Sequence, residues 1–154
     1  MHKQRIYIDT SVIGGCFDKE FAEWSNLLFD EFISGRKIAV ISDILIDELS
    51  KAPNIIKNKI KEIQEKNLEI VHKNQEVITL ANSYVTNNAI SNKYTDDALH
   101  IAFATINKVD VLVSWNFKHI VNLRRIQLYN GINLTNGYSL LEIRSPREVY
   151  ENEE

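Results

Sequence analysis

Short apolar runs along the chain alternate with longer stretches in which apolar residues recur every three or four positions. The apolar runs predict strands at 5–9, 37–42, 68–72, 109–114 and 140–143. The longer stretches predict helices at 20–34, 42–50, 54–66, 75–89, 96–107 and 118–129, and Ser145-Pro146-Arg147-Glu148 predicts a capping box that opens a short last helix. Because strands that alternate with helices connect by right-handed crossovers, the pattern predicts an α/β fold with a parallel sheet covered on both faces.

The size of the chain is right for one such domain. It has 154 residues, of which 44% are hydrophobic and 25% charged, as is ordinary for a globular protein with one core. No internal repeat or linker interrupts the pattern, so we expect a single domain over 1–150. The sequence Glu-Asn-Glu-Glu at the end predicts an acidic tail at 151–154.

The composition argues against several classes of protein. Cys16 is the single cysteine, which leaves no disulfide framework and no cysteine-based zinc site. We expect no signal peptide and no membrane span, since no run approaches roughly 18 apolar residues, and a cytoplasmic location follows. The net charge of −3 gives no overall basic character, although a local basic patch would suffice to bind a nucleic acid.

Four oxygen-bearing side chains stand at or near the ends of apolar elements. Asp9 closes the first strand and Asn116 lies just past the fourth, while Glu48 lies on the helix after the second strand. Asp97 begins the helix that precedes the fourth strand. A carboxylate at a buried strand end is costly unless a cation or a hydrogen-bond donor meets it. Ligands of open parallel sheets bind beyond the carboxyl ends of the strands, so we expect these four side chains to converge.

Such a cluster favours a hard divalent cation. Clustered carboxylates repel one another, and oxygen ligands with no cysteine nearby favour Mg²⁺ or Mn²⁺. An ion of this kind orients a water, promotes its deprotonation and stabilises the charge of a phosphodiester transition state. The four residues together therefore predict a metal site that acts on phosphate.

Each of these residues taken alone also has a purely structural interpretation. Asp9 would cap the helix that follows it, and Glu48 would be a solvated helix residue. Asp97 would meet the dipole of a helix N-terminus, an interpretation that covers Asp96 equally well. Asn116 would be a turn residue. The metal interpretation rests on the combination.

Other candidate sites are weaker. His100 lies at helical spacing from Asp96 and Asp97, but a buried histidine that bonds a neighbouring acid is more common than a metal ligand. Cys16 and His119 are too isolated to predict a nucleophile and its base, and Gly14-Gly15 is no dinucleotide fingerprint. One basic cluster fits either RNA phosphates or a solvated helix face. It comprises Lys118, His119, Arg124 and Arg125.

In order and spacing, the fragments YIDTSVI, DELS, DDALHIAFA and VLVSWNFKHI resemble the PIN-domain family over nearly the whole chain, and specifically its VapC-like toxin ribonucleases. The resemblance implies a three-layer α/β/α sandwich with a mainly parallel sheet. It implies a ribonuclease for single-stranded RNA that depends on Mg²⁺ or Mn²⁺, with Asp9, Glu48 and Asp97 as the acids that bind the metal. It also implies a small antitoxin as a partner and a homodimer.

Asn116 is the departure from the family, because a fourth acid usually stands there. The change removes one negative charge and should weaken the binding of a second metal, although an amide oxygen still binds a cation or its water. We expect Asn116 to assist the three acids in catalysis. The residues expected to contact the substrate are Thr10, Ser114, Lys118, Arg124 and Arg125.

Three functions remain open at this stage. The first is the endoribonuclease. The second is a weakly active or inactive PIN-fold module that binds RNA or a protein partner, which Asn116 and the modest basic character favour. The third is a metal-dependent phosphatase for a small molecule, although Ser11 occupies the place of the second acid in the DxDxT pattern of haloacid-dehalogenase-type phosphatases.

Overall fold

The computed structural model describes residues 2–150, so the predicted acidic tail at 151–154 lies outside the described residues. The strands are β1 (Arg5–Ile8), β2 (Ile38–Ser42), β3 (Leu68–Val71), β4 (Val111–Val113) and β5 (Ile143–Arg144). The helices are α1 (Thr10–Gly15), α2 (Ala22–Ser34), α3 (Asp43–Ser50), α4 (Asn54–Ile60), α5 (Gln75–Thr86), α6 (Thr95–Ile106) and α7 (Leu123–Thr135), with short 3-10 helices η1 (Glu65–Asn67) and η2 (Asn92–Tyr94).

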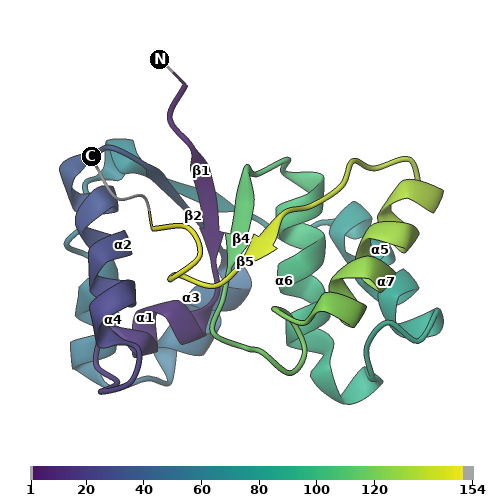
Figure 1. The fold of residues 1–154 in the computed structure, drawn as a ribbon, viewed down its shortest axis with the longest axis horizontal. Helices are drawn as coiled ribbons and strands as arrows, with labels where there is room; N and C mark the ends of the chain where they lie inside the picture. The colour runs from purple at the N-terminus through teal and green to yellow at the C-terminus, as the bar shows by residue number, and fades with distance from the viewer. Residues whose placement is uncertain (1, 151–154) are drawn as a thin grey trace.

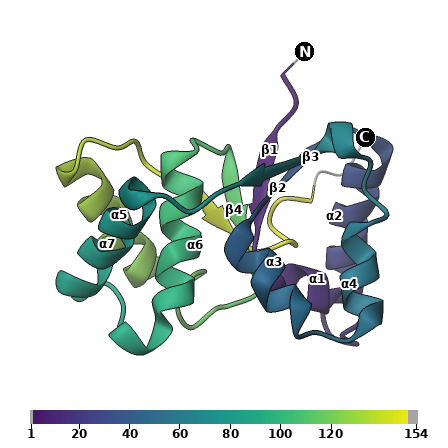
Figure 2. The same cartoon turned by 180° about the vertical axis from the view of Figure 1, so that it is seen from behind.

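The five strands form one parallel sheet in the order β3-β2-β1-β4-β5. The first strand, β1, is therefore central, with β2 and β4 on either side of it. Helices α1, α2 and α4 cover one face of the sheet and α5, α6 and α7 cover the other (Figure 1). Figure 2 shows the molecule from behind, with β3 at the edge of the sheet. The predicted three-layer α/β/α architecture is confirmed.

The strands are apolar throughout because both of their faces are buried. Along β1, Ile6 and Ile8 join the core under α1, α2 and α4, while Tyr7 between them joins the core under α5 and α6. In β4 the same alternation places Leu112 on one face of the sheet and its neighbours Val111 and Val113 on the other. A parallel sheet that is covered on two sides requires this near-continuous hydrophobic pattern.

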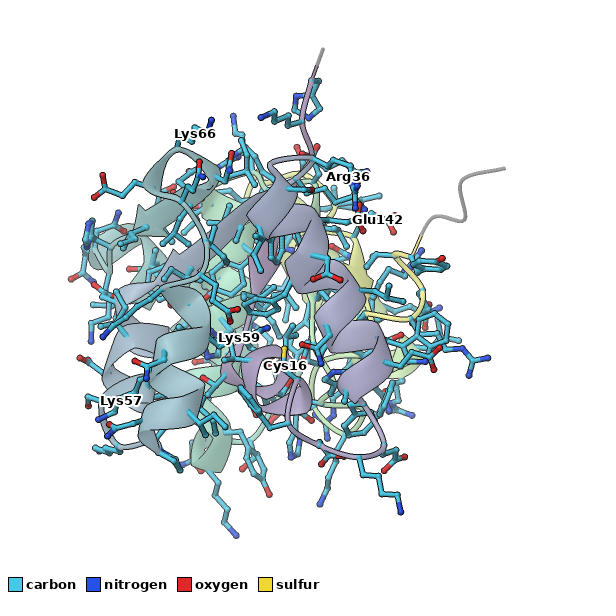
Figure 3. All side chains as sticks on the ribbon, turned by 90° about the vertical axis from the view of Figure 1, so that its left-hand side faces the viewer. Cys16, Arg36, Lys57, Lys59, Lys66 and Glu142 are labelled. Carbon is cyan, nitrogen blue, oxygen red and sulfur yellow. The ribbon has the colours of Figure 1, made fainter. Side chains whose placement is uncertain are left out.

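Cys16, for which the sequence favoured a structural role over a catalytic one, lies in the core beneath α2 and α4 (Figure 3). Burial raises the pKa of its thiol to about 11, although the nearby Lys59 acts in the opposite direction. A thiol with such a pKa is protonated at neutral pH and is not a nucleophile. Lys57 and Lys66 lie on the outside of the same layer (Figure 3).

The helix predicted at 118–129 is displaced to α7, which spans Leu123–Thr135. Residues 117–120 form a turn instead, and Asn122 then caps α7 by accepting the backbone N–H of Arg125 at 3.2 Å. An asparagine that satisfies a free N–H is a strong start signal for a helix, and it outweighs the apolar periodicity that runs through the turn.

Three further differences concern short elements. The sequence prediction missed α1, whose six residues include Gly14 and Gly15, and it extended α4 past its end at Ile60. The capping box forms, since Ser145 and Glu148 exchange side-chain bonds with each other's backbone N–H, but the residues after it make only a turn. Within the described residues, no helix has the length and apolar character that crossing a membrane requires.

Candidate metal centre

The four predicted site residues come together at the carboxyl edge of the sheet. Asp9 directly follows β1 and Asn116 lies three residues past β4, while Glu48 comes from α3 and Asp97 from the first turn of α6. The strands run downward in Figure 1, so this edge lies at the bottom of the sheet, beside α1 and α3. Four sequence-distant elements thus supply the side chains of one site.

Asp9 is buried, with 4% of its surface exposed, and both of its carboxylate oxygens accept hydrogen bonds. The hydroxyl of Ser11 donates to Oδ1 and that of Ser114 to Oδ2, each at 2.6 Å. Burial raises the pKa of Asp9, and the charge of Glu48 raises it further, while His100 and the two serine hydroxyls act against these effects. The first acid is therefore a desolvated group held in place by two serines.

The same two serines join the end of β1 to the end of β4. Ser11 Oγ accepts the backbone N–H of Trp115 at 2.9 Å, and Ser114 Oγ accepts the backbone N–H of Asn116 at 2.9 Å. The hydroxyl proton of Ser114 is directed at Asp9, so the geometry supports a positioning role for this residue. Ser11 was not singled out in the sequence, because its role depends on a segment about a hundred residues away.

Glu48 has a hydrogen-bond partner on each oxygen. Thr10 Oγ1 donates to Oε2 at 2.9 Å, and His100 Nε2 lies 2.9 Å from Oε1. Burial acts to raise the pKa of Glu48, but the hydrogen bond and charge of His100 and the hydroxyl of Thr10 outweigh it, so the pKa is lowered. Glu48 is therefore held as a carboxylate, and Thr10 serves to orient it.

His100 is the centre of a buried chain of hydrogen bonds that the sequence did not reveal. Its Nδ1 lies 2.6 Å from the hydroxyl of Tyr7, which in turn donates to Ser42 Oγ at 2.8 Å. Because the Tyr7 proton is directed at Ser42, an imidazole that carries protons on both nitrogens satisfies every contact. Burial acts to lower the pKa of His100, but Glu48, Asp9 and Asp97 raise it overall. The surrounding acids thus favour the protonated form of His100.

Asp97 is partly buried in the first turn of α6. Burial raises its pKa to about 6, with Asp9 and Glu48 acting in the same direction against the charge of His100. Asn116 Nδ2 donates to its Oδ2 at 3.2 Å. The neighbouring Asp96 is exposed. The choice of Asp97 over Asp96 as a member of the cluster therefore agrees with the structure.

Asn116 is both a turn residue and a member of the site. Its side-chain oxygen accepts the backbone N–H groups of Lys118 and His119, at 3.2 and 3.0 Å. Its backbone oxygen accepts those of Ile120 and Val121, at 3.1 and 2.8 Å. Only the amide nitrogen faces the acids, through the bond to Asp97. Here Asn116 supplies a hydrogen-bond donor to the cluster, where a fourth acid would supply an oxygen.

The donor set fits a hard divalent cation. Asp9, Glu48 and Asp97 supply only oxygen. The pKa values of the two aspartates are raised by burial and by the other acids, and a bound cation would offset both effects. Among residues 2–150, however, no three acidic, histidine or cysteine side chains are gathered closely enough to hold an ion directly. A cation that keeps several of its waters, as Mg²⁺ does, needs only one or two of the carboxylates.

A basic hollow of about 380 Å³ is connected to the cluster through Lys118, whose backbone N–H donates to Asn116. Arg125 in its wall donates to the backbone oxygens of Ala89 and Lys118, at 2.7 and 3.1 Å. His119 is buried beside Tyr94, with ring centroids 3.8 Å apart, and takes no part in the hollow. The residues that line the hollow are Asn88, Lys118, Asn122, Arg124, Arg125 and Leu128.

Solved structures of VapC proteins share this fold. A chain of the crystal structure of VapBC2 from Rickettsia felis, bound to a DNA fragment from their promoter, matches with a TM-score of 0.60 and 15% identity, over 92% of this chain and 98% of that chain. VapC20 from Mycobacterium tuberculosis, a Sarcin-Ricin loop cleaving toxin, matches with a TM-score of 0.57 and 10% identity, over 74% of this chain and 92% of that one. By sequence, no protein-family model and no curated protein matches. The chain therefore has a VapC-like PIN-domain fold.

Proposed function

We propose that the protein is an endoribonuclease that depends on Mg²⁺ or Mn²⁺ and hydrolyses phosphodiester bonds of single-stranded RNA. The observation that carries the proposal is the convergence of Asp9, Glu48 and Asp97, which come from three separate elements and are held there by hydrogen bonds to neighbouring side chains. The fold supports it, since one protein with the same fold is described as a toxin that cleaves the Sarcin-Ricin loop.

In this proposal the three acids hold the cation, in part through its waters. When bound, the cation would lower the pKa of a water and neutralise charge on the scissile phosphate. Thr10 and Ser114, which we expected to contact substrate, would instead orient Glu48 and Asp9. Asn116 would hold Asp97 and fix the turn that follows.

The cations beside the acids would hold the RNA backbone. Lys118 and Arg124 are exposed on the wall of the basic hollow, where phosphates of the strand would meet them. Arg125 is tied to two backbone oxygens, so it would contribute its charge from a fixed position.

The test is cleavage of single-stranded RNA in Mg²⁺ or Mn²⁺ by the native protein and by Asp97→Asn. We expect the variant to lose at least about 100-fold in rate, because it removes a charged oxygen ligand. Asp96→Asn is the matched control, since it makes the same change at an exposed position one residue earlier. Equal cleavage by all three proteins would sink the assignment.

A second candidate is an inactive PIN-fold module that binds RNA or a protein. It is favoured by Asn116, and by the protein hydrogen bonds that already occupy both oxygens of Asp9 and of Glu48. Calorimetry separates the two functions, because an inactive module would show no heat with millimolar Mn²⁺ and would still bind its partner. Substrate profiling would separate either from a small-molecule phosphatase.

We further propose that the protein is the toxin of a toxin–antitoxin pair, acts in the cytoplasm and forms a homodimer. The VapC-like fold supports this, because one of the matching structures is a VapBC2 complex. Light scattering on the purified chain tests the dimer. Growth arrest on expression of the native chain, absent with Asp97→Asn, tests the toxic activity.

A further inference from the structure

Three aromatic side chains beside the metal centre have no part in binding the cation. Trp115, which is 9% exposed, stacks on Phe21 with ring centroids 4.2 Å apart and an interplanar angle of 20°. Phe117 meets Trp115 edge to face at 6.1 Å and is 50% exposed. We call Phe21, Trp115 and Phe117 the aromatic platform. It presents a large apolar ring to solvent in the same segment that carries Ser114 and Asn116.

Trp115 is fixed in place by contacts on several sides. Its indole Nε1–H donates to Ser25 Oγ at 2.8 Å, and its backbone N–H donates to Ser11 Oγ at 2.9 Å. Gly15 lies so close that a Cβ at this position would stand 2.7 Å from Nε1. Because Ser11 also binds Asp9, the platform is connected to the first acid by hydrogen bonds. Trp115 is therefore a fixed surface against which the ring of Phe117 packs, and this lowers the cost of ordering that ring on a ligand.

A cation follows the platform directly in the chain. Lys118 follows Phe117 in the chain and lines the basic hollow together with Arg124 and Arg125. Along the chain the order is therefore the residues that bond the acids, Ser114 and Asn116, then the exposed ring, then a cation of the hollow, and the turn that Asn116 holds connects them. Proteins that bind single-stranded nucleic acid combine these same two parts, since bases stack on aromatic rings and phosphates meet cations.

We propose that Phe117 stacks on an unpaired nucleobase next to the scissile phosphate, while the basic hollow binds a neighbouring phosphate of the same strand. The proposal rests on the proposed function for the identity of the ligand as RNA. It also supplies a physical basis for single-strand specificity, because the faces of bases in a duplex are covered by their neighbours. An apolar protein segment is the competing occupant of such a surface, but the adjoining cations favour a strand that carries phosphates.

The experiment measures RNA binding without cleavage, by fluorescence anisotropy of labelled single-stranded oligoadenylate in EDTA. Phe117→Leu keeps the apolar bulk and removes the aromatic face, so we expect about tenfold weaker binding. Phe117→Trp should bind at least as tightly as the native protein. Ile55→Ala is the control, because Ile55 is 59% exposed on α4, away from the platform, and should not change the affinity. Duplex RNA should bind more weakly, and Phe117→Leu should not weaken it further.

A second readout uses the indole itself. The chain has two tryptophans, so Trp24→Phe leaves Trp115 as the only one. Its emission should change when oligoadenylate binds, and Phe117→Leu in the same background should reduce that change. A Trp115 emission spectrum that does not change on addition of RNA would count against stacking at this position.

The outcomes separate the platform from the nuclease. Equal RNA affinity of the native protein and Phe117→Leu overturns the platform, as does the absence of any RNA binding. Altered self-association of Phe117→Leu with unchanged RNA affinity also overturns it and identifies a protein contact. RNA that binds through Phe117 but is not cleaved in Mn²⁺ leaves the platform standing and removes the nuclease. Cleavage that needs Asp97 but not Phe117 supports the nuclease and overturns the platform.

Discussion

The two chain segments that flank the metal centre differ in how far their side chains are exposed to solvent. The β1 flank, Asp9 to Ser11, directs its side chains inward, where their oxygens bond to one another and to β4 and α3. The β4 flank, Ser114 to Lys118, begins with a buried serine and ends with an exposed phenylalanine and an exposed lysine. One flank fixes the acids, and the other offers contacts to a ligand. A change in the first should therefore reduce stability and metal binding, whereas a change in the second should reduce RNA binding.

The largest expected effect comes from His100→Ala, because His100 on α6 contacts both Tyr7 of β1 and Glu48 of α3. The variant leaves the half-buried Glu48 without its imidazole partner and Tyr7 without one of its contacts, so the free energy of unfolding should fall by about 3 kcal/mol. Urea denaturation measures it. His72→Ala is the control, because the side chain of His72 is 76% exposed beside Asp43 and its loss should cost little. Similar losses in the two variants would contradict the structural role of His100.

Gly15→Ala should have the next largest effect, because the added methyl group would clash where α1 packs against Trp115 of the β4 flank. A Cβ there would stand 2.6 Å from Ser25 Oγ and 2.7 Å from Trp115 Nε1, so the variant should lose about 2 kcal/mol of stability. The emission of Trp115 should shift as the indole moves. Gly14→Ala tests the explanation, since a Cβ at that position meets nothing within 4 Å and alanine favours the helix. Destabilisation of both variants alike would point to the helix itself.

Asp97→Asn should stabilise the metal-free protein, by about 1–2 kcal/mol at neutral pH. Burial raises the pKa of Asp97 from 3.8 to about 6, so the folded state holds this proton more tightly than the unfolded state does. The resulting stability is present below pH 3.8 and is lost as the pH rises through about 6.

Thermal denaturation across this pH range measures the effect. The native and variant proteins should have similar melting temperatures below pH 3.8, diverge between pH 3.8 and about 6, and keep a constant gap above that, with the variant higher. Addition of Mn²⁺ should raise the melting temperature of the native protein and close the gap. A variant that is less stable than the native protein at neutral pH without metal would refute the assigned cause.

Asn116→Asp should have the smallest effect on stability, and its sign should depend on metal. Without metal, a carboxylate replaces the amide that donates to Asp97, and the repulsion should cost about 1 kcal/mol. With Mn²⁺, the added charge should tighten binding about tenfold. Calorimetry with Mn²⁺ measures the affinity and the number of ions bound. The turn should persist, since a carboxylate oxygen accepts the two backbone N–H groups equally well. Unchanged affinity would mean that position 116 lies too far from the ion.

The sequence was sufficient for the architecture and for the clustering of the acids. Burial on both faces leaves a continuous apolar pattern in each strand, which Asp9 interrupts at a strand end, while Glu48 and Asp97 stand on the helices after β2 and before β4. The helix predicted from Ser42 onward forms as α3, and the side chain of Ser42 caps it by accepting the N–H of Leu45. These features depend on neighbours in the sequence, which is why local patterns reveal them.

The hydrogen-bond partners of the acids could not be predicted, because they are distant in the sequence. Tyr7 looks like any core residue of a strand, and only the fold brings its hydroxyl to His100, 93 positions later. Ser11 meets the backbone of Trp115 across a similar separation. The displaced start of α7 has a different cause, since Asn116 and Asn122 each determine a local structure that hydrophobic periodicity does not report.

The central position of β1 has a consequence for how the site opens. Strand β2 pairs with one edge of β1 and β4 pairs with the other. The amide hydrogens of β1 should therefore exchange with solvent only when the whole domain unfolds. Amides of the turn at 117–121 depend on the oxygens of Asn116 and should exchange through local opening. The segment proposed to bind RNA can thus open and reclose many times while Asp9 stays in place, so the site can release a strand without losing its first acid.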